Sequence, residues 1–302
     1  MIEQYPTSLR NDQIVIGMMN RPCLLIFGHG YTANAFVDYI RSIDWEIFGT
    51  TRNAQTADLL IKKDVKPLMW SDESKIKSVI NRSDYILHSI PPTEIGDPVY
   101  KRFAEAIISR STNLSWFGYL STTSVYGNHD GKWVDENTPV NPSSSRGLLR
   151  VKAENNWSSI NDLPLHIFRL AGIYGPDRSP LDKIRSGKAQ LIIKPGQVFS
   201  RIHVEDIARV LKASIEMPNR GSVYNVCDDM PAAPDEVLDY AARLINYPDL
   251  PKVAFEEADL SPMAKSFYSE NKRVKNELIK SEFKFTLKYP DFETGLNALA
   301  GK

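Results

Sequence analysis

Short apolar segments alternate with helix-spaced segments along most of this chain, and that alternation limits the fold more than any other feature of the sequence. The apolar segments, which predict buried strands, are 23–27, 45–50, 66–70, 84–89, 116–121, 165–170 and 222–226. The segments with helical spacing are 32–43, 98–109, 146–160, 204–215 and 233–244. Continuously apolar strands separated by helices predict a parallel sheet that is covered by helices on both faces.

The length and the end of the pattern predict two structural units. The chain has 302 residues, and a domain usually takes roughly 100–200. After about Asn246 the alternation stops, because prolines interrupt it and aromatic and charged residues mix. We therefore expect an N-terminal extension, a main α/β domain and a smaller, more irregular lobe, with these boundaries: 1–21; 22–171 with 201–228; 172–200 with 229–302.

Composition excludes several classes of protein. Lys and Arg number 37, as do Asp and Glu, and this balance argues against a nucleic-acid binder. No apolar stretch approaches the ~20 residues of a membrane helix, and the N-terminus lacks the apolar core of a signal peptide. The cysteines, Cys23 and Cys227, lie in apolar runs and are too few for a disulfide framework or a metal site. We expect a soluble, cytoplasmic protein with no metal, membrane or nucleic-acid partner.

A glycine-rich turn follows the first predicted strand. Residues 28–33 read G-x-G-x-x-A and lead into a helix. Gly28 permits a tight turn, Gly30 lets the backbone approach a pyrophosphate, and Ala33 keeps the helix close to the sheet. The N-terminus of the helix adds free amides and a positive dipole end. The pattern predicts a dinucleotide site, with these residues expected to contact the cofactor: Gly28, His29, Gly30, Tyr31 and Thr32.

The end of the second predicted strand selects between the two nicotinamide cofactors. NAD sites place a carboxylate there for the ribose 2′-hydroxyl, but this chain has Thr51 and Arg52. An arginine suits a 2′-phosphate, so NADP is favoured, with NAD as the alternative cofactor and a solvated surface role as the alternative for Arg52. The segment after the fourth strand is expected to contact the same cofactor through Ser89, Ile90 and Pro91.

Residues 120–127, LSTTSVYG, resemble the S-[ST]-x-x-V-Y-G signature of the extended short-chain dehydrogenases/reductases, the NAD-dependent epimerase/dehydratase family. Segments 169–176, 200–206 and 223–226 resemble further elements of that family in the same order. The resemblance covers about residues 22–298, and within the family the chain looks most similar to the YeeZ-like bacterial proteins. It implies a Rossmann-type doubly wound, mainly parallel sheet with a smaller C-terminal lobe, in which the main domain binds NAD(P) and the lobe meets a small-molecule substrate.

The resemblance also assigns a catalytic hydroxyl. Thr122 falls where the family has the Ser or Thr that hydrogen-bonds the substrate oxygen at the carbon that gains or loses hydride. Thr123 takes that place if the register shifts by one, and a strand-end turn rich in Ser and Thr is the structural alternative.

The chain departs from the family at the Tyr-x-x-x-Lys pair. One register places Arg146 and Arg150 at those positions, and another places Leu148 at the tyrosine position. Arginine stays protonated and cannot act as a general acid or base, although Arg150 is expected to hold the nicotinamide ribose. Tyr126 and Tyr174 are the candidates to carry the proton, if a nearby cation lowers the pKa of either. Both are equally open to a role in loop packing.

Two functions stay open. The first is an NADP-dependent oxidoreductase or epimerase-like enzyme acting on an unknown small polar substrate, which Thr122 supports. The second is a non-catalytic NADP(H)-binding redox sensor, which the missing tyrosine supports. Lys265, Lys272 and Arg273 either meet an anionic substrate or form a solvated helix face, so a sugar nucleotide is not well supported. By resemblance, segment 146–160 is a candidate helix for a homodimer.

Overall fold

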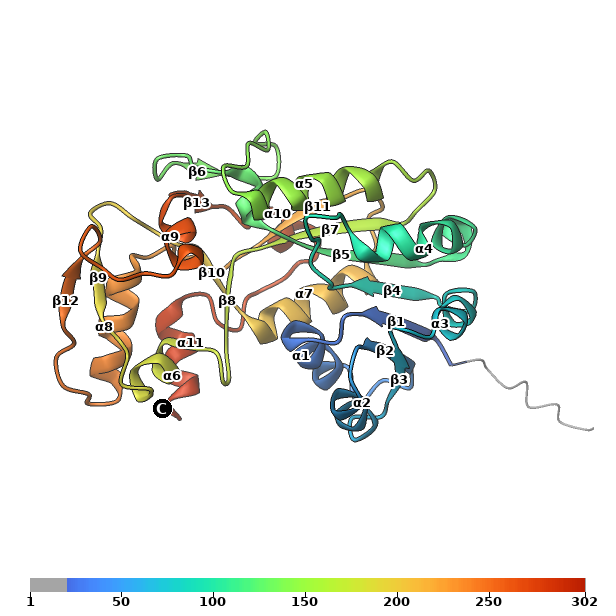
Figure 1. Cartoon of the computed structure of the whole chain (residues 1–302), viewed down its shortest axis with the longest axis horizontal. Helices are drawn as coiled ribbons and strands as arrows, with labels where there is room; N and C mark the ends of the chain where they lie inside the picture. The colour runs from blue at the N-terminus through green and yellow to red at the C-terminus, as the bar shows by residue number, and fades with distance from the viewer. Residues whose placement is uncertain (1–20, 302) are drawn as a thin grey trace, which may run out of the picture.

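Seven parallel strands form the centre of the computed structural model, which describes residues 21–301 (Figure 1). The expected extension 1–21 therefore lies outside the described residues, apart from Arg21. The strand order is β11-β7-β5-β4-β1-β2-β3. The strands are β1 (Cys23–Phe27), β2 (Glu46–Thr51), β3 (Val65–Met69), β4 (Tyr85–His88), β5 (Trp116–Thr122), β7 (Leu165–Leu170) and β11 (Val223–Val226).

Helices cover both faces of this sheet. One face packs on α1 (Tyr31–Tyr39) and α7 (Val204–Glu216), and the other on α3 (Glu73–Ile80), α4 (Pro98–Ile108) and α5 (Ser145–Ser158). The helix α2 (Ala54–Ile61) packs beside β3 at the edge. All five residues of β1 are buried, as a strand between two helical layers requires. The predicted doubly wound α/β fold is thus confirmed.

The direction in which successive strands are added to the sheet reverses at β1. β2 and β3 lie on one side of β1, and β4 and the strands beyond it lie on the other. This reversal is the topological switch point, and ligands of such sheets bind outside the carboxyl ends of the strands there. The two short helical turns η1 (Ser111–Asn113) and η2 (Thr123–Tyr126) flank β5, and η2 lies at its carboxyl end.

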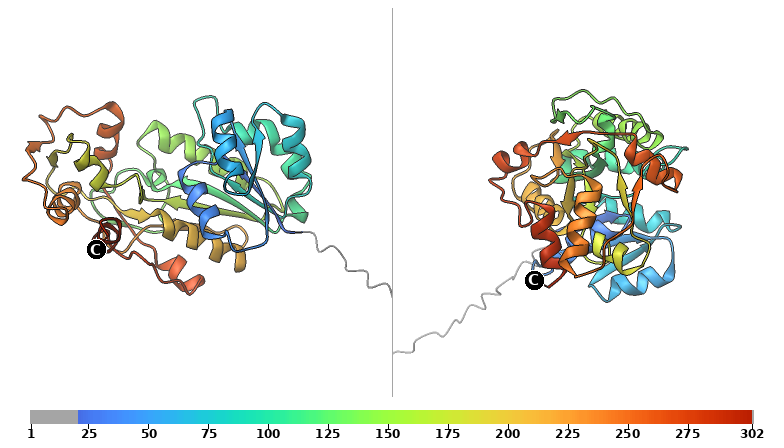
Figure 2. Two further views of the ribbon diagram at one scale, coloured as in Figure 1. Left: turned by 90° about the horizontal axis from the view of Figure 1, so that it is seen from below. Right: turned by 90° about the vertical axis from the view of Figure 1, so that its left-hand side faces the viewer.

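A smaller lobe lies beyond the carboxyl ends of β5 and β7 (Figures 1 and 2). Its core contains Leu181, Leu191, Leu238 and Phe292. Its elements are α6 (Pro180–Arg185), β9 (Leu191–Ile193), α8 (Pro234–Leu244), β12 (Lys252–Ala254), α9 (Pro262–Tyr268) and α11 (Phe292–Leu299). β9 pairs with β12 in parallel. The chain enters and leaves through a second parallel pair, β8 (Gly172–Tyr174) and β10 (Arg201–His203).

The chain then returns from the lobe to the main sheet. β13 (Arg273–Val274) pairs with β6 (Trp133–Val134), and α10 (Glu277–Glu282) packs against β11. Ile279 belongs to the same apolar cluster as the residues of β1 and β7. This stretch falls inside the range 229–302 expected for the lobe, yet it lies against the main sheet.

Within residues 21–301, no helix has the length and apolarity to cross a bilayer. The same residues contain no group of His, Cys, Asp and Glu side chains arranged to hold a metal ion.

A buried carboxylate ties together the elements behind the sheet. Asp97 caps the N-terminus of α4, accepts hydrogen bonds from the amides of Val99 and Tyr100, and lies 2.8 Å from His88 Nε2. Trp157 of α5 donates its indole N–H to the same carboxylate at 2.8 Å. Burial alone would raise the pKa of Asp97, but these bonds outweigh it and lower the pKa below the ordinary value.

We predict that Asp97→Ala lowers the free energy of unfolding by at least roughly 1–3 kcal/mol, the cost of an unsatisfied buried donor. The folded-state pKa of Asp97 is below its unfolded value of 3.8. Its ionised form therefore stabilises the fold fully above pH 3.8, and this stabilisation is lost as the pH falls through the folded-state pKa. Chemical denaturation at neutral and acidic pH measures both effects. Asp72→Ala is the matched control, because Asp72 also caps a helix but is only partly buried and leaves no buried donor unpaired. Equal losses in the two variants would contradict the prediction.

Candidate functional site

The glycine turn between β1 and α1 is open to a ligand. Gly28 has a φ of +82°, and its amide donates to Thr50 Oγ1 at 2.8 Å. Gly30 precedes α1 as its N-cap, and a Cβ built on it would meet nothing within 4 Å. The amides of the first turn of α1 have no intrahelical acceptor. Open space in front of a helix N-terminus is the cradle that a pyrophosphate needs.

The side chains around this turn point in different directions. His29 is buried, and a Cβ at Gly49 would lie 2.8 Å from His29 Nδ1, so the imidazole packs against β2. Burial lowers the pKa of His29 to about 4. A neutral ring turned toward the sheet does not support the expected phosphate contact by this side chain. Tyr31 donates its hydroxyl to the Pro176 carbonyl at 2.8 Å, and Thr32 is buried.

Arg52 is exposed at the carboxyl end of β2 and makes no hydrogen bond or ion pair with any described residue. Thr51 donates its hydroxyl to the Asn53 carbonyl at 3.3 Å. Across the switch point, the Ser89 amide bonds to Phe27 O at 2.9 Å, and Ile90 Cγ1 would lie 2.6 Å from a Cβ on Gly28. The glycine turn therefore lies between an unpaired cation on one side and the residues after β4 on the other.

These residues fit a dinucleotide. A pyrophosphate requires the open space at Gly30 and the tight turn that the left-handed Gly28 permits. A ribose phosphate requires a cation such as the exposed Arg52. Pro91 is exposed next to Ile90, in the segment after β4 that the sequence predicts to contact the cofactor.

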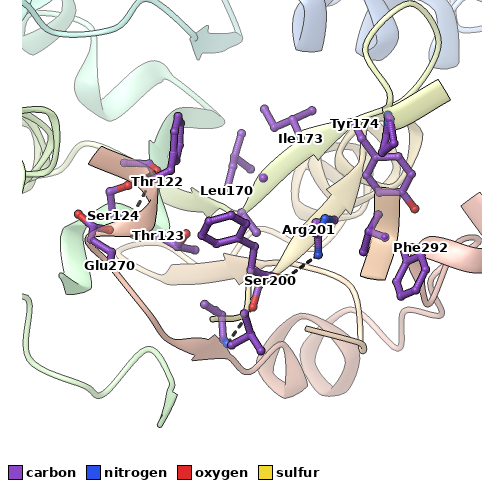
Figure 3. Close-up of a pocket in the computed structure, with 18 of the residues that line it drawn as sticks. Thr122, Thr123, Ser124, Leu170, Ile173, Tyr174, Ser200, Arg201, Glu270 and Phe292 are labelled. Atoms are coloured by element: carbon purple, nitrogen blue, oxygen red, sulfur yellow. Dashed lines mark hydrogen bonds between the residues drawn. The ribbon is translucent and has the colours of Figure 1, made fainter. Parts of the chain in front are cut away.

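A cavity of about 560 Å³ lies between the ends of β5 and β7 and the smaller lobe (Figure 3). Thr122, Thr123, Ser124 and Glu270 gather at one end of it, Arg201 lies in the middle, and Tyr174 and Phe292 lie at the other end. Leu170, Val198 and Leu296 contribute apolar walls. The arrangement suits a small molecule with an apolar body and polar groups at defined positions.

Thr122 lies where β5 ends and η2 begins. Its hydroxyl accepts a hydrogen bond from the Ser124 amide at 3.3 Å and lies 3.5 Å from Ser124 Oγ. The Thr122 side chain lines the cavity and is only partly buried. Since a hydroxyl both donates and accepts, Thr122 retains capacity to bind a substrate oxygen.

Tyr126 lies in the core. It is fully buried and does not line the cavity, its hydroxyl donates to Asn225 Oδ1 at 2.8 Å, and Arg169 Nη1 donates to that hydroxyl at 3.0 Å. Burial raises the pKa of Tyr126 although the Arg169 cation opposes that shift. This placement does not support the expected proton-carrying role of Tyr126.

Tyr174 does line the cavity, but its environment is unfavourable for proton transfer. Its hydroxyl donates to the Asp291 carbonyl at 3.3 Å, and a Cβ on Gly295 would overlap it. Burial, followed by the charges of Asp228 and Asp206, raises the pKa of Tyr174 far above its ordinary value. The lowered pKa that a proton-carrying tyrosine requires is therefore not found here.

The two arginines at the family's Tyr and Lys positions have separate contacts. Arg146 is exposed, and its guanidinium lies over the Phe267 ring at 4.3 Å. Arg150 donates to Tyr119 Oη at 3.1 Å and to the Leu120 carbonyl. Arg150 thus lies beside β5, and its remaining N–H groups make no hydrogen bond with residues 21–301.

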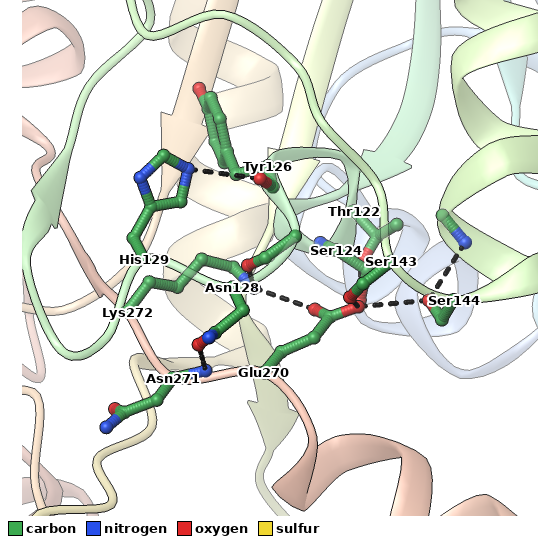
Figure 4. A network of polar contacts seen from close by, with 12 residues as sticks. Thr122, Ser124, Tyr126, Asn128, His129, Ser143, Ser144, Glu270, Asn271 and Lys272 are labelled. Atoms are coloured by element: carbon green, nitrogen blue, oxygen red, sulfur yellow. Dashed lines mark hydrogen bonds and ion pairs between the residues drawn. The ribbon is translucent and has the colours of Figure 1, made fainter.

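A lysine and a glutamate complete the end of the cavity that Thr122 occupies (Figure 4). Lys272 Nζ donates to Gly127 O at 2.8 Å and to Glu270 Oε2 at 2.7 Å, and Ser144 Oγ donates to Glu270 Oε1 at 3.0 Å. Both charged side chains are buried. Burial lowers the pKa of Lys272, whereas Glu270 opposes that shift. From the sequence, Lys272 was grouped with Lys265 and Arg273 as a cation that either meets an anionic substrate or lies on a solvated helix face, and no role was predicted for Glu270.

Arg201 had no role predicted from the sequence. Its Nη1 donates to the carbonyls of Phe199 and Ala232 at 2.9 and 3.0 Å, and its Nε and Nη2 have no hydrogen-bond partner among the described residues. Burial lowers the pKa of its guanidinium, and the charge of Asp228 opposes that shift without forming an ion pair with Arg201 among the described residues. The one sequence signal for a role at the site was its position in the segment 200–206, which resembles a family element.

A parallel doubly wound sheet with an open glycine turn at its switch point defines a Rossmann-type nucleotide-binding protein. Residues 24–227 match the model of the NAD dependent epimerase/dehydratase family. The chain belongs to that family, as its motifs predicted.

Relatives with known sequences or structures agree with this assignment. Protein YeeZ of Escherichia coli is 24% identical over 278 residues, which cover 88% of this chain and 96% of YeeZ. A conserved protein of unknown function from Silicibacter pomeroyi is 50% identical, with a TM-score of 0.89 and coverage of 93% of this chain and 98% of that one. The dTDP-glucose 4,6-dehydratase of Bacillus anthracis, solved in complex with NAD, is 19% identical with a TM-score of 0.75 over 93% and 96% of the two chains. It shares the fold.

We predict that Gly30→Val abolishes binding of NADPH and NADH while the protein stays folded. The backbone at Gly30 has φ −101° and ψ −159°, which valine adopts readily, and the space in front of it is empty. The added side chain would therefore obstruct the pyrophosphate without disturbing the packing. Calorimetry measures binding and far-UV circular dichroism measures folding. Gly30→Ala should cause a smaller loss, and wild-type affinity in the valine variant would show that the turn is only structural.

Proposed function

We propose that this protein is an NADP(H)-dependent oxidoreductase or epimerase-like enzyme acting on a small hydroxy or oxo compound that carries an anionic group. The observation that carries the proposal is the shared edge: the open glycine cradle and the Thr122 end of the cavity both lie at the carboxyl ends of one parallel sheet. Ligands of such sheets bind at that edge.

Each part of the dinucleotide has a proposed partner in this chain. The amides at Gly30 and the start of α1 bind the pyrophosphate, and Arg52 binds the 2′-phosphate as an uncommitted cation. Arg150 binds the nicotinamide ribose with the N–H groups that Tyr119 and Leu120 leave free. When bound, the nicotinamide supplies or accepts a hydride. The role of the protein is to orient the substrate, exclude water and move a proton.

The proposed substrate class follows from the cavity. Thr122 binds the oxygen of the reacting carbon, because its hydroxyl both donates and accepts. Arg201 binds an anionic group, preferably a carboxylate, since its Nε and Nη2 form a planar pair of donors that no residue in the described part of the chain accepts from. The apolar walls between them accommodate a short carbon skeleton. The volume of about 560 Å³ lies within the usual range of small-molecule sites.

A non-catalytic NADP(H)-binding redox sensor is the second candidate. The raised pKa values of both Tyr126 and Tyr174 favour it, because neither tyrosine suits proton transfer. The two candidates differ in turnover: a sensor binds NADPH tightly and turns over no substrate.

We predict that the wild type binds NADPH more tightly than NADH and that Arg52→Ala removes this preference. Loss of a charge-assisted phosphate contact should cost roughly 1.5–3 kcal/mol of NADPH binding, with little change for NADH. Calorimetry with both cofactors measures the difference. Lys62→Ala is the control, because Lys62 is an exposed cation at the far end of α2. Equal affinity of the wild type for both cofactors would overturn the assignment of Arg52.

We also predict turnover of short-chain hydroxy acids or oxo acids in preference to the corresponding methyl esters. The ester is larger by only one methyl group but lacks the charge that Arg201 meets. In an NADPH absorbance assay, Thr122→Val should lower kcat by about 10²-fold or more with cofactor affinity unchanged, because it removes only the hydroxyl, and Thr122→Ser should restore turnover.

Two outcomes would contradict this substrate class. Equal turnover of acids and esters would remove Arg201 from substrate recognition. A substrate that Thr122→Val turns over at the wild-type rate would place the reaction outside this end of the cavity.

A further inference from the structure

The proposed reaction lacks a proton carrier, since the groups expected to supply one are occupied elsewhere. Arg146, at the family's tyrosine position, lies over the Phe267 ring. Tyr126 is buried outside the cavity, and Tyr174 lies at its opposite end from Thr122. An oxygen bound by Thr122 needs a group that exchanges a proton from the same end of the cavity.

The Glu270–Lys272 pair is at that end. Both residues line the cavity with Thr122 and Ser124, although they come from the segment that leads back from the lobe to the sheet (Figures 3 and 4). An ammonium has three donors, and Lys272 uses two of them, toward Gly127 O and Glu270 Oε2. The third has no partner among the described residues, and the Lys272 side chain lines the cavity.

We propose that Lys272 is the catalytic proton carrier of this protein and that Glu270 is its positioning residue. This inference rests on the proposed function, because it assigns the acid–base group of the same reaction. It gives the chain a substitute for the Tyr-x-x-x-Lys pair that its sequence lacks.

The proton transfer balances in both directions. In oxidation, the substrate C–H bond breaks and its electron pair leaves with the hydrogen as a hydride, which NADP⁺ accepts. The O–H bond breaks as well, its proton moves to the lone pair of Lys272 Nζ, and the electron pair left on oxygen becomes the second bond of the carbonyl. In reduction, the Lys272 ammonium returns that proton to the oxygen as hydride reaches the carbon.

The surroundings of Lys272 allow it to change its charge. Burial lowers its pKa from the ordinary 10.5, Glu270 opposes this shift, and Arg146 adds to it. The net lowering of the pKa makes deprotonation of this amine easier than deprotonation of an exposed lysine. Glu270 is in turn fixed by the hydroxyls of Ser143 and Ser144, at 3.3 and 3.0 Å.

The first test titrates the lysine directly, without a substrate. In protein labelled at the lysine Cε with ¹³C, the signal absent from Lys272→Arg identifies Lys272. We predict that it titrates below 10.5, that Glu270→Gln lowers its pKa further, and that NADP⁺ lowers it more than NADPH does because of the positive nicotinamide. A Lys272 pKa that is not lowered from 10.5, or that does not change when NADP⁺ binds, would overturn the proposal. Failure of NADP⁺ to bind at all would instead overturn the proposed function.

The second test uses any substrate found in the absorbance assay. We predict that Lys272→Met and Lys272→Arg lower kcat by about 10²–10⁴-fold with NADPH affinity unchanged, because arginine keeps the charge but does not exchange the proton. The limb of the pH profile that belongs to Lys272 should disappear in the arginine variant. Lys265→Met is the matched control, since Lys265 is exposed on α9 and does not line the cavity. Wild-type rates and pH profile in Lys272→Arg would assign the lysine to structure alone.

Discussion

The position of β1 between β2 and β4 is the constraint on which the rest of the site depends. All seven strands are parallel, so their carboxyl ends meet at one edge, and the connections diverge at β1. The glycine turn follows β1, Arg52 follows β2, Ser89 follows β4, and Thr122 ends β5. Residues distant in sequence therefore meet at one edge because each of them directly follows a strand.

The sequence predicted the parts of this fold that depend on local patterns. The predicted strands 23–27 and 165–170 coincide with β1 and β7, because every residue of both is buried and apolar residues dominate them. No helix was predicted from the sequence at α2 or α3. Each has eight residues, and α2 buries only Leu60, so the amphipathic pattern is too short to distinguish from a loop.

The candidate site divides in the same way between local and distant effects. The positions of Gly28, Gly30 and Thr122 were predictable because each of them ends or directly follows a predicted strand. Tyr126 was misjudged because its partner Asn225 is 99 residues away. Lys272 is 145 residues from Gly127, whose carbonyl holds it. A lysine among charged neighbours gives no indication in sequence that the fold will bury it against a cavity.

Two buried ion pairs near the cavity contain the same kinds of residue but differ in whether they line the cavity. This difference in position decides which pair is a candidate for proton transfer. In the first, Arg169 donates to Glu154 at 2.8 Å and to Tyr126 Oη, Ser121 also donates to Glu154, and Tyr126 donates to Asn225. Neither charged residue of that pair lines the cavity, so its bonds offset the cost of burying charge and fix the ends of β5, β7 and β11 together. In the second, Lys272 keeps one donor uncommitted at the wall of the cavity. A pair that lies away from the cavity can only support structure, whereas a pair whose lysine lines the cavity can exchange a proton with a ligand.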